Sequence, residues 1–354
     1  MTERFQWMLD WLETLPILQG CEVSDPVPAS SDASFRRYFR IDVTCDNSKA
    51  VQTPQSKSSS YIIMDAPPEQ ENCEPFIAVS NQLVKMGLQV PEVLEQNLEQ
   101  GFLLLSDLGS TTFLSVLENT TESEADRLYQ DALKALVTLQ LKGQEAAKEL
   151  PAYNADLLNI EMDLFSDWLL GRHLETPLSA LEQQDWQQLK RTLIDSALAQ
   201  PKTYVHRDYH SRNLMLTEQD NPGILDFQDA VYGPLTYDAV SLLRDCYIAW
   251  PAEQVREWQR RYFLQLAEKG LVAKNDWNGF VRAMDLMGIQ RHLKASGIFA
   301  RLFHRDGKDG YLNDIPLTLK YIVEVGSNYP EMSWLVNLLE SRVLPHSQLQ
   351  KESA

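Results

Sequence analysis

The chain of 354 residues has no apolar run long enough to span a bilayer, which excludes a transmembrane helix. It has only four cysteines, and these lie far apart without a C-x-x-C pair: Cys21, Cys45, Cys73 and Cys246. We therefore expect neither a zinc site nor a disulfide framework. The N-terminus opens into an amphipathic helical pattern without the apolar core of a signal peptide, so a reducing cytoplasm is the expected location.

Positive charge is also scarce, since 32 basic residues face 50 acidic ones and the formal net charge is -18. No basic stripe offsets this charge, which argues against binding to nucleic acid or to an anionic membrane surface. Nothing in the sequence indicates an obligate protein partner. Hydrophobic residues make up 44% and charged residues 23%, which is typical of a globular protein with room for one large or two ordinary domains.

The spacing of apolar residues divides the chain into a strand-rich first third and a helical remainder. Before residue 106, we expect helices near 5–15 and 74–86, strands near 34–43, 61–64, 93–95 and 101–105, and a polar loop over 44–60. Beyond it, helical spacing recurs over 125–139, 157–170, 181–198, 255–267 and 280–303. The pattern predicts an α+β protein with a small antiparallel-sheet lobe over 1–106 and a mainly helical lobe over 107–354.

The most informative motif is H-x-D-x-x-x-x-N, formed by His206, Asp208 and Asn213 and followed by Asp226-Phe227 at the end of an apolar segment. This order is typical of phosphoryl-transfer sites of the kinase type. In such sites an Asp accepts the proton of an acceptor hydroxyl, and an Asn and a second Asp hold magnesium against ATP phosphates. Oxygen-bearing side chains suit this hard cation.

The segments around the motif predict a short strand followed by a hairpin. Residues 203–205 lead into the loop, while 213–216 and 223–227 form two apolar strands around a turn-rich segment. A hairpin of this kind returns Asp226 toward Asn213. A polar loop between core strands is the alternative, and the complete order and spacing argue against it.

The chain resembles the aminoglycoside phosphotransferase-like kinases, which share the protein-kinase fold, and more narrowly the anomeric kinases of N-acetylmuramate and N-acetylglucosamine. The resemblance spans roughly residues 30–325. The motifs that carry it are SDASFRRYFR at 31–40, IMDAPP at 63–68, HRDYHSRN at 206–213, LDFQDA at 225–230, GPLTYD at 233–238 and QRHLK at 290–294.

The resemblance implies roles for the motif residues. Asp208 matches the catalytic Asp, and Asn213 and Asp226 match the magnesium ligands. His206 and His210 are expected to support the loop geometry. Two further residues have two interpretations each. Asp238 is expected to brace the loop through backbone N–H groups, with a helix N-cap as the alternative, and Asp229 either bonds a sugar hydroxyl or caps a turn.

The small lobe departs from the kinase pattern, because it has no G-x-G-x-x-G and no lysine on the third strand. The small residues Ser31, Ala33 and Ser34 stand where that glycine-rich loop is expected, and their backbone can still bind phosphates. Arg36, Arg37 or Arg40 is expected to supply the missing charge, unless these arginines form a solvated strand face. Glu71 or Glu74 is a possible ion-pair partner for such an arginine, and Asp107 and Leu108 lie in the segment expected to bind adenine. The residues assigned to nucleotide binding are Ser31, Ala33, Ser34, Arg37, Arg40, Asp107 and Leu108.

The sugar site is expected in the helical lobe. Arg291, Lys294 and Arg301 lie on one predicted helix, and a cationic side chain is the natural partner of the lactyl carboxylate of N-acetylmuramate. We assign Asp229, Arg291, Lys294 and Arg301 to substrate binding. The alternative for the helix is a solvated basic face.

The resemblance implies an ATP- and Mg2+-dependent amino-sugar kinase that forms a sugar 1-phosphate in cell-wall peptidoglycan recycling toward UDP-N-acetylmuramate. An aminoglycoside kinase is a rival hypothesis, but its acceptor site should be rich in Asp and Glu. A non-catalytic ATP-binding regulator is a second rival, suggested by the missing lysine and glycines. The complete set of Asp208, Asn213 and Asp226 argues against it.

Overall fold

The computed structural model describes residues 3–31, 35–45 and 57–349. The chain divides into two compact units. The first contains Met1–Thr111 and Met215–Gln228, and the second contains Thr112–Leu214 and Asp229–Ala354. The sequence predicted a single boundary, between residues 106 and 107. In the structure the first unit also includes a later segment, because the hairpin after the H-x-D motif packs with it.

The first unit is built on an antiparallel sheet with strand order β1-β3-β4-β6-β5 and with β2 paired to β3. Its elements within the described residues are α1 (Glu3–Thr14), a 3-10 turn (Pro16–Leu18), β1 (Cys21–Val23), β2 (Val27–Ser31), β3 (Arg37–Cys45), β4 (Lys57–Asp65), α2 (Glu74–Lys85), β5 (Val93–Asn97) and β6 (Phe102–Ser106). The last of these leads toward the adenine segment predicted from the sequence.

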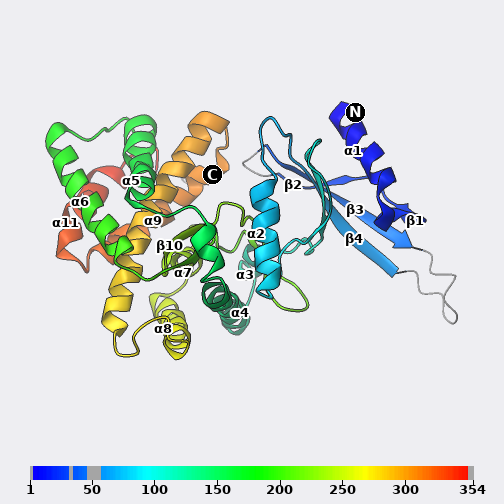
Figure 1. Cartoon of the computed structure of the whole chain (residues 1–354). Helices are drawn as coiled ribbons and strands as arrows, with labels where there is room; N and C mark the ends of the chain where they lie inside the picture. The colour runs from blue at the N-terminus through cyan, green and yellow to red at the C-terminus, as the bar shows by residue number, and fades with distance from the viewer. Residues whose placement is uncertain (1–2, 32–34, 46–56, 350–354) are drawn as a thin grey trace. The chain divides into compact units, whose positions relative to one another are not determined.

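One face of this sheet is covered by α1, and Figure 1 shows α2 on the opposite side of the sheet. Met8 and Leu12 of α1 pack in one apolar cluster with Ile41, Ile63 and Leu104 of the strands. These strand residues share a face because side chains alternate along a strand. The apolar spacing that predicted the first helix therefore marks the stripe that the sheet buries.

Two expectations about the first unit are wrong. The loop expected over 44–60 is shorter, since β3 continues to Cys45 and β4 begins at Lys57, and residues 46–56 lie outside the described residues. Cys21 and Cys45 form a disulfide with their Cα atoms 4.2 Å apart. Although 24 positions separate these cysteines in the sequence, the antiparallel pairing of β1 with β3 brings them directly opposite each other.

The hairpin Met215–Gln228 is anchored within the first unit. β8 (Leu214–Met215) and β9 (Gly223–Ile224) form a two-stranded sheet. The backbone N–H of Ile224 donates to Gln89 O at 2.7 Å, and that of Leu216 donates to Thr111 O at 2.8 Å. The Phe227 ring packs against Phe76 of α2 with 4.8 Å between centroids. These contacts explain why the hairpin belongs with the sheet.

The second unit is mainly helical. Its elements within the described residues are α3 (Phe113–Leu117), α4 (Glu122–Lys142), a 3-10 turn (Ala146–Glu149), α5 (Ala155–Leu164), a π-helix (Phe165–His173), α6 (Ala180–Leu198), β7 (Lys202–Val205), β10 (Val231–Pro234), α7 (Tyr237–Leu243), α8 (Ala252–Glu268), α9 (Trp277–Asp306), a 3-10 turn (Gly310–Asp314), α10 (Ile315–Gly326), a 3-10 turn (Pro330–Met332), α11 (Ser333–Leu338) and a π-helix (Leu339–Val343). The helical segments predicted by spacing lie within or overlap α4, α5, α6, α8 and α9.

The long helix α9 runs through the core of this unit and packs closely against α5. The approach is tightest at Gly297, where an added Cβ would lie 2.2 Å from the backbone of Leu164. Only glycine permits this contact, because any other side chain would clash with that backbone. The close approach brings polar side chains of the two helices within reach of each other. No helix in the described part of the chain is long and apolar enough to cross a membrane.

Candidate active site

The loop that follows β7 contains the H-x-D motif, and Asp238 of α7 holds its start. The carboxylate of Asp238 accepts the backbone N–H of His206 at 2.7 Å and that of Arg207 at 2.9 Å. The side chain is buried, and this burial raises the pKa of Asp238 to about 7, although both backbone hydrogen bonds favour the charged form. The arrangement is that of a residue that braces the loop.

Asp208 sits on a tightly bonded backbone. Arg207 has a positive φ of 79°, which turns the chain, and the Asp208 N–H donates to His206 Nδ1 at 3.2 Å. The Asp208 carbonyl accepts Asn213 Nδ2 at 3.0 Å and the backbone N–H of His210 at 3.1 Å. Among the described residues, the Asp208 carboxylate itself makes no hydrogen bond, so it is available to an incoming hydroxyl group.

The charge state of Asp208 reflects its surroundings. Burial raises the pKa of its carboxyl, but the positive charge of Lys294 and contributions from His210, His206 and Arg207 outweigh burial and lower it below its ordinary value. Asp208 is therefore ionised at neutral pH, as a proton acceptor has to be.

Both loop histidines are buried and packed. The His206 ring lies edge-on to Tyr209, and the His210 ring lies edge-on to Tyr247, with centroid distances of 5.7 and 5.2 Å. Burial lowers the pKa of His210, so its imidazole stays neutral at physiological pH. These contacts fit the supporting role expected for His206 and His210.

The two residues assigned to magnesium lie in different units. Asn213 belongs to the second unit, where its bond to the Asp208 carbonyl fixes the orientation of its amide. Asp226 belongs to the first unit and has a positive φ of 61°, a strained backbone conformation for a residue other than glycine. Its Oδ1 accepts Gln228 Nε2 at 2.7 Å. Within the described residues, no group of three or more His, Cys, Asp or Glu side chains suits a metal ion.

The arginines assigned to the nucleotide each pair with a carboxylate of the first unit. Arg37 bonds Asp65, and Arg40 bonds Asp107 through Nε at 2.6 Å and Nη2 at 3.0 Å. Arg40 Nη2 also donates to the Gly109 carbonyl at 2.9 Å. Arg40 and Asp107 are thus bonded to each other, which ties β3 to the segment after β6.

Arg36 takes a different partner. Its Nη2 lies 3.1 Å from Glu71 Oε2, and the backbone N–H of Phe35 donates to Glu71 Oε1 at 3.0 Å. Of the two glutamates expected to pair with an arginine of this cluster, Glu71 is the one that does so among the described residues. Leu108 is buried beside the hairpin. Ser31 ends β2, whereas Ala33 and Ser34 lie outside the described residues.

The residues assigned to the sugar fall into two groups. Arg291 and Lys294 are only 6% and 7% exposed, so a solvated basic face at these two positions is excluded. Within the described residues, the Arg291 guanidinium makes one hydrogen bond, a 3.5 Å contact from Nη1 to the Cys246 sulfur. Arg301 is partly buried farther along α9, and the Asp229 side chain is exposed. A buried arginine with so few partners is able to bind an anionic group.

Sequence reasoning missed two carboxylates of the second unit. Asp245 accepts the Ser211 N–H at 2.9 Å and the Ser211 hydroxyl at 2.6 Å, which braces the far end of the loop. Glu161 of α5 binds Arg207 at 2.6 Å and Lys294 at 3.1 Å. The sequence does contain a signal for Glu161. It is a glutamate within the apolar stripe of a predicted helix, where a charged residue is rarely buried without a partner.

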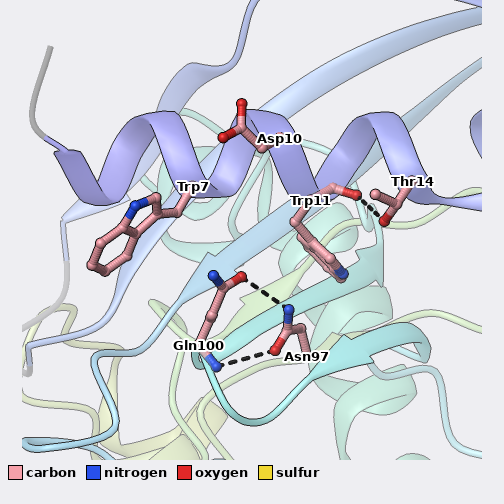
Figure 2. A pocket seen from close by; sticks show the side chains of 6 residues that line it. All are labelled: Trp7, Asp10, Trp11, Thr14, Asn97 and Gln100. Carbon is pink, nitrogen blue, oxygen red and sulfur yellow. Dashed lines mark hydrogen bonds between the residues drawn. The ribbon is translucent and has the colours of Figure 1, made fainter.

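A separate hollow of about 260 Å³ lies in the first unit between α1 and the turn after β5. Figure 2 shows Trp7 and Trp11 facing Asn97 and Gln100, whose amides bond each other at 3.0 Å. None of the residues assigned to catalysis, nucleotide or sugar lines this hollow.

Comparison with solved structures shows the fold. A Plasmodium vivax ethanolamine kinase matches with a TM-score of 0.62 at 11% identity, over 96% of this chain and 89% of the other. A choline kinase from Streptococcus pneumoniae matches with a TM-score of 0.58 at 12% identity, over 92% and 100%. The ADP-bound aminoglycoside phosphotransferase APH(2'')-Ib matches with a TM-score of 0.53 at 13% identity, over 90% and 97%. The α+β, protein-kinase-like two-lobe fold predicted from the sequence is confirmed.

A protein-kinase-like fold with an H-x-D-x-x-x-x-N loop braced by Asp238 is the arrangement of a phosphotransferase. The model of the phosphotransferase enzyme family matches residues 25–273. The chain belongs to this family.

Curated relatives narrow the comparison. The chain is 44% identical to a Pseudomonas aeruginosa protein over 96% of both chains. It is 46% identical to a Pseudomonas putida protein over 88% of this chain and 86% of the relative, and 43% identical to one from Neisseria meningitidis over 93% of each. All three relatives are named N-acetylmuramate/N-acetylglucosamine kinase.

Proposed function

We propose that the protein is an ATP-dependent kinase that phosphorylates the C1 hydroxyl of N-acetylmuramate and N-acetylglucosamine. The observation that carries this proposal is the Asp208 carboxylate, which is ionised, held by its backbone and without a hydrogen-bond donor among the described residues. The names of the relatives supply the acceptor. The reaction would serve cell-wall recycling toward UDP-N-acetylmuramate, in the cytoplasm, where ATP is available.

In this mechanism Asp208 orients the C1 hydroxyl and takes its proton as the bond from oxygen to the γ-phosphorus of ATP forms. The bond between that phosphorus and the β,γ-bridging oxygen breaks, and ADP leaves. The anomeric hydroxyl is more acidic than an ordinary alcohol, so a carboxylate is a sufficient base. His206 and Asp238 keep the loop in place during the transfer, and His210 supports it from the side of Tyr247.

Asn213 and Asp226 are proposed as magnesium ligands. Both carry side-chain oxygen atoms, which this cation prefers. The set of one amide and one carboxylate fits Mg2+ that takes its remaining ligands from phosphates and water. When bound, the ion neutralises charge that develops on the phosphates.

Nucleotide binding is proposed for the backbone of Ser31, Ala33 and Ser34 at the phosphates. The backbone of Asp107 and Leu108 is proposed to bind adenine. Arg37 and Arg40 would supply positive charge, and Arg37 is the more accessible because its side chain is 45% exposed, against 29% for Arg40.

For the sugar, Arg291 is the proposed partner of the lactyl carboxylate, because its buried guanidinium has a single weak hydrogen bond within the described residues. Lys294 contributes a second buried cation. Asp229 and Arg301 complete the proposed set, with Asp229 bonding a sugar hydroxyl. Two buried cations in the acceptor region argue against a polycationic aminoglycoside as the substrate.

A transfer assay with ATP, magnesium and N-acetylmuramate, followed by phosphorus NMR of the product, tests the proposal. We expect a sugar 1-phosphate, recognised as a doublet from coupling to the anomeric proton. Phosphate on another carbon would overturn the assignment to C1. No transfer to N-acetylmuramate, N-acetylglucosamine or kanamycin would overturn the kinase proposal and favour an ATP-binding regulator.

A further inference from the structure

The carboxylate of Glu161 is the centre of a buried polar cluster in the second unit. Glu161 lies on α5, and its side chain is 5% exposed. Four side chains bond to its two oxygens. These are Arg207 Nη2 at 2.6 Å and Lys294 Nζ at 3.1 Å on Oε1, and Gln290 Nε2 at 3.3 Å and the Tyr153 hydroxyl on Oε2.

This cluster joins the catalytic loop to two helices. Arg207 immediately precedes Asp208 in the chain, and its Nη1 also reaches the Asp229 carbonyl at 3.5 Å. Lys294 comes from α9, and its ammonium also donates to the Tyr237 hydroxyl at 3.0 Å. A single carboxylate on α5 therefore sets the positions of a loop cation and a helix cation beside the proposed base.

The positive charges of this cluster depend on the carboxylate of Glu161 for compensation. Arg207 and Lys294 bring two positive charges into a region with little water, and within the described residues Glu161 is the carboxylate that bonds both. Removing one partner of a buried ion pair leaves the other charge uncompensated. Without Glu161, the two cations would repel each other and leave the positions seen here.

We propose that Glu161 is a positioning residue of the transfer reaction, whose carboxylate holds Arg207 and Lys294 where they act on Asp208 and the acceptor sugar. This inference rests on the proposed kinase function and extends it to a residue that contacts neither the nucleotide nor the sugar in that proposal. Neutral glutamine has nearly the same shape, so Glu161→Gln isolates the contribution of the charge.

The charge of Glu161 also sets the protonation of Lys294. The charged and titratable groups that face Lys294 are Glu161, Tyr237, Arg207 and Asp208. Burial lowers the pKa of Lys294, but the negative charge of Glu161 contributes most to raising it above its ordinary value. The Lys294 ammonium thus keeps its proton across the physiological range. When Glu161 is neutral, burial prevails and Lys294 loses its proton at a lower pH.

The test compares the pH dependence of kcat for the wild-type enzyme and for Glu161→Gln, with ATP and N-acetylmuramate as substrates. We expect kcat of the variant to fall about 10- to 100-fold, with the KM for ATP unchanged. We also expect the alkaline limb of its kcat profile to move down by about one pH unit or more as Lys294 deprotonates. A merely structural role would lower the amount of folded enzyme without moving this limb.

Asp163→Asn is the matched control. Asp163 lies on the same helix two positions later and binds the buried Lys190 of α6 at 2.5 Å. The control removes a carboxylate from a buried lysine without touching the catalytic loop, so it should leave the alkaline limb in place. If Glu161→Gln has the same limb and the same kcat as this control, the inference is wrong.

Lys294→Met covers the case in which Glu161→Gln does not fold. This variant leaves Glu161 and Arg207 paired one to one, and we expect it to fold and to lose kcat by a similar factor with an unchanged KM for ATP. Wild-type kcat in Lys294→Met would overturn the inference. Absence of sugar phosphorylation by the wild-type enzyme would instead contradict the proposed function, so the two failures are distinguishable.

Discussion

Two buried carboxylates, one in each unit, bind two cations apiece, and they differ in how much water reaches those cations. Asp65 of the first unit binds two arginines, of which Arg37 is 45% exposed. Glu161 of the second unit binds an arginine and Lys294, whose side chain is 9% exposed. An exposed guanidinium keeps most of its hydration when its partner is lost, whereas a buried ammonium does not. A carboxylate with two cations therefore braces the sheet in the first unit, and in the second unit it stabilises buried positive charge.

The largest effect is expected for Asp208→Asn. This variant removes the carboxylate that reacts and leaves Asp65 and Glu161 in place. Turnover should fall about 10²- to 10⁴-fold because the proton acceptor is lost. Stability should fall only modestly, because the attraction to Lys294 that lowers the pKa of Asp208 is lost but no hydrogen bond of its carboxylate among the described residues is broken. Steady-state kinetics and the thermal unfolding midpoint check both parts, and a large drop in the midpoint would contradict the second.

Loss of the two carboxylates should lower stability by unequal amounts. Glu161→Gln should lower the free energy of unfolding by about 3–5 kcal/mol, because it leaves buried charges unpaired. Asp65→Asn should cost less, about 1–2 kcal/mol, since Arg37 can turn into water and the less exposed Arg4 keeps its hydrogen bond to the Gln100 carbonyl. Urea unfolding of the two variants under the same conditions gives the values. Equal losses would mean that exposure of the cations does not set the cost.

Asp238 offers a prediction about pH. Its folded pKa of about 7 lies above the ordinary value of 3.8, so the folded protein binds more protons than the unfolded chain between these pH values. Its contribution to stability is therefore complete below about pH 4 and is lost as the pH rises through 7. Asp238→Asn cannot titrate, so its unfolding midpoint in urea should fall less steeply between pH 4 and 7 than that of the wild type. Parallel slopes would contradict this expectation.

The smallest effect is expected for Cys21→Ser. The disulfide with Cys45 joins strands that already pair in the sheet, at a position remote in sequence from the catalytic loop. We expect wild-type turnover and a thermal midpoint lowered by a few degrees, since a cross-link mainly restricts the unfolded chain. A tenfold loss of turnover would show that the disulfide reaches the reaction.

Much of the fold was predictable because it depends on local spacing. The apolar stripes of α4, α8 and α9 repeat at helical intervals, and the short strands of the first unit are bounded by turn residues. The disulfide and the pairing of β7 with β10 were not predictable, because both depend on which distant strands lie side by side. Local patterns contain no information on such pairings.

The candidate site was predictable to a similar extent. Asp208, Asn213 and Asp226 stand in a fixed order that the chemistry requires, so they could be named from the sequence alone. Glu161 could not, because its importance comes from three-dimensional contacts with Arg207 and Lys294, at separations of 46 and 133 positions. The assignments to nucleotide and sugar stay predictions that the proposed variants test.

The hairpin that belongs to the first unit has a consequence for synthesis of the chain. The polypeptide passes from one unit to the other after Thr111, after Leu214 and after Gln228. A ribosome that has completed the sheet still has about a hundred residues of the helical unit to make before the hairpin emerges. The first unit therefore cannot be completed until Thr112–Leu214 of the second unit has been made, and an expression fragment ending at Thr111 would lack the strand that bonds Gln89.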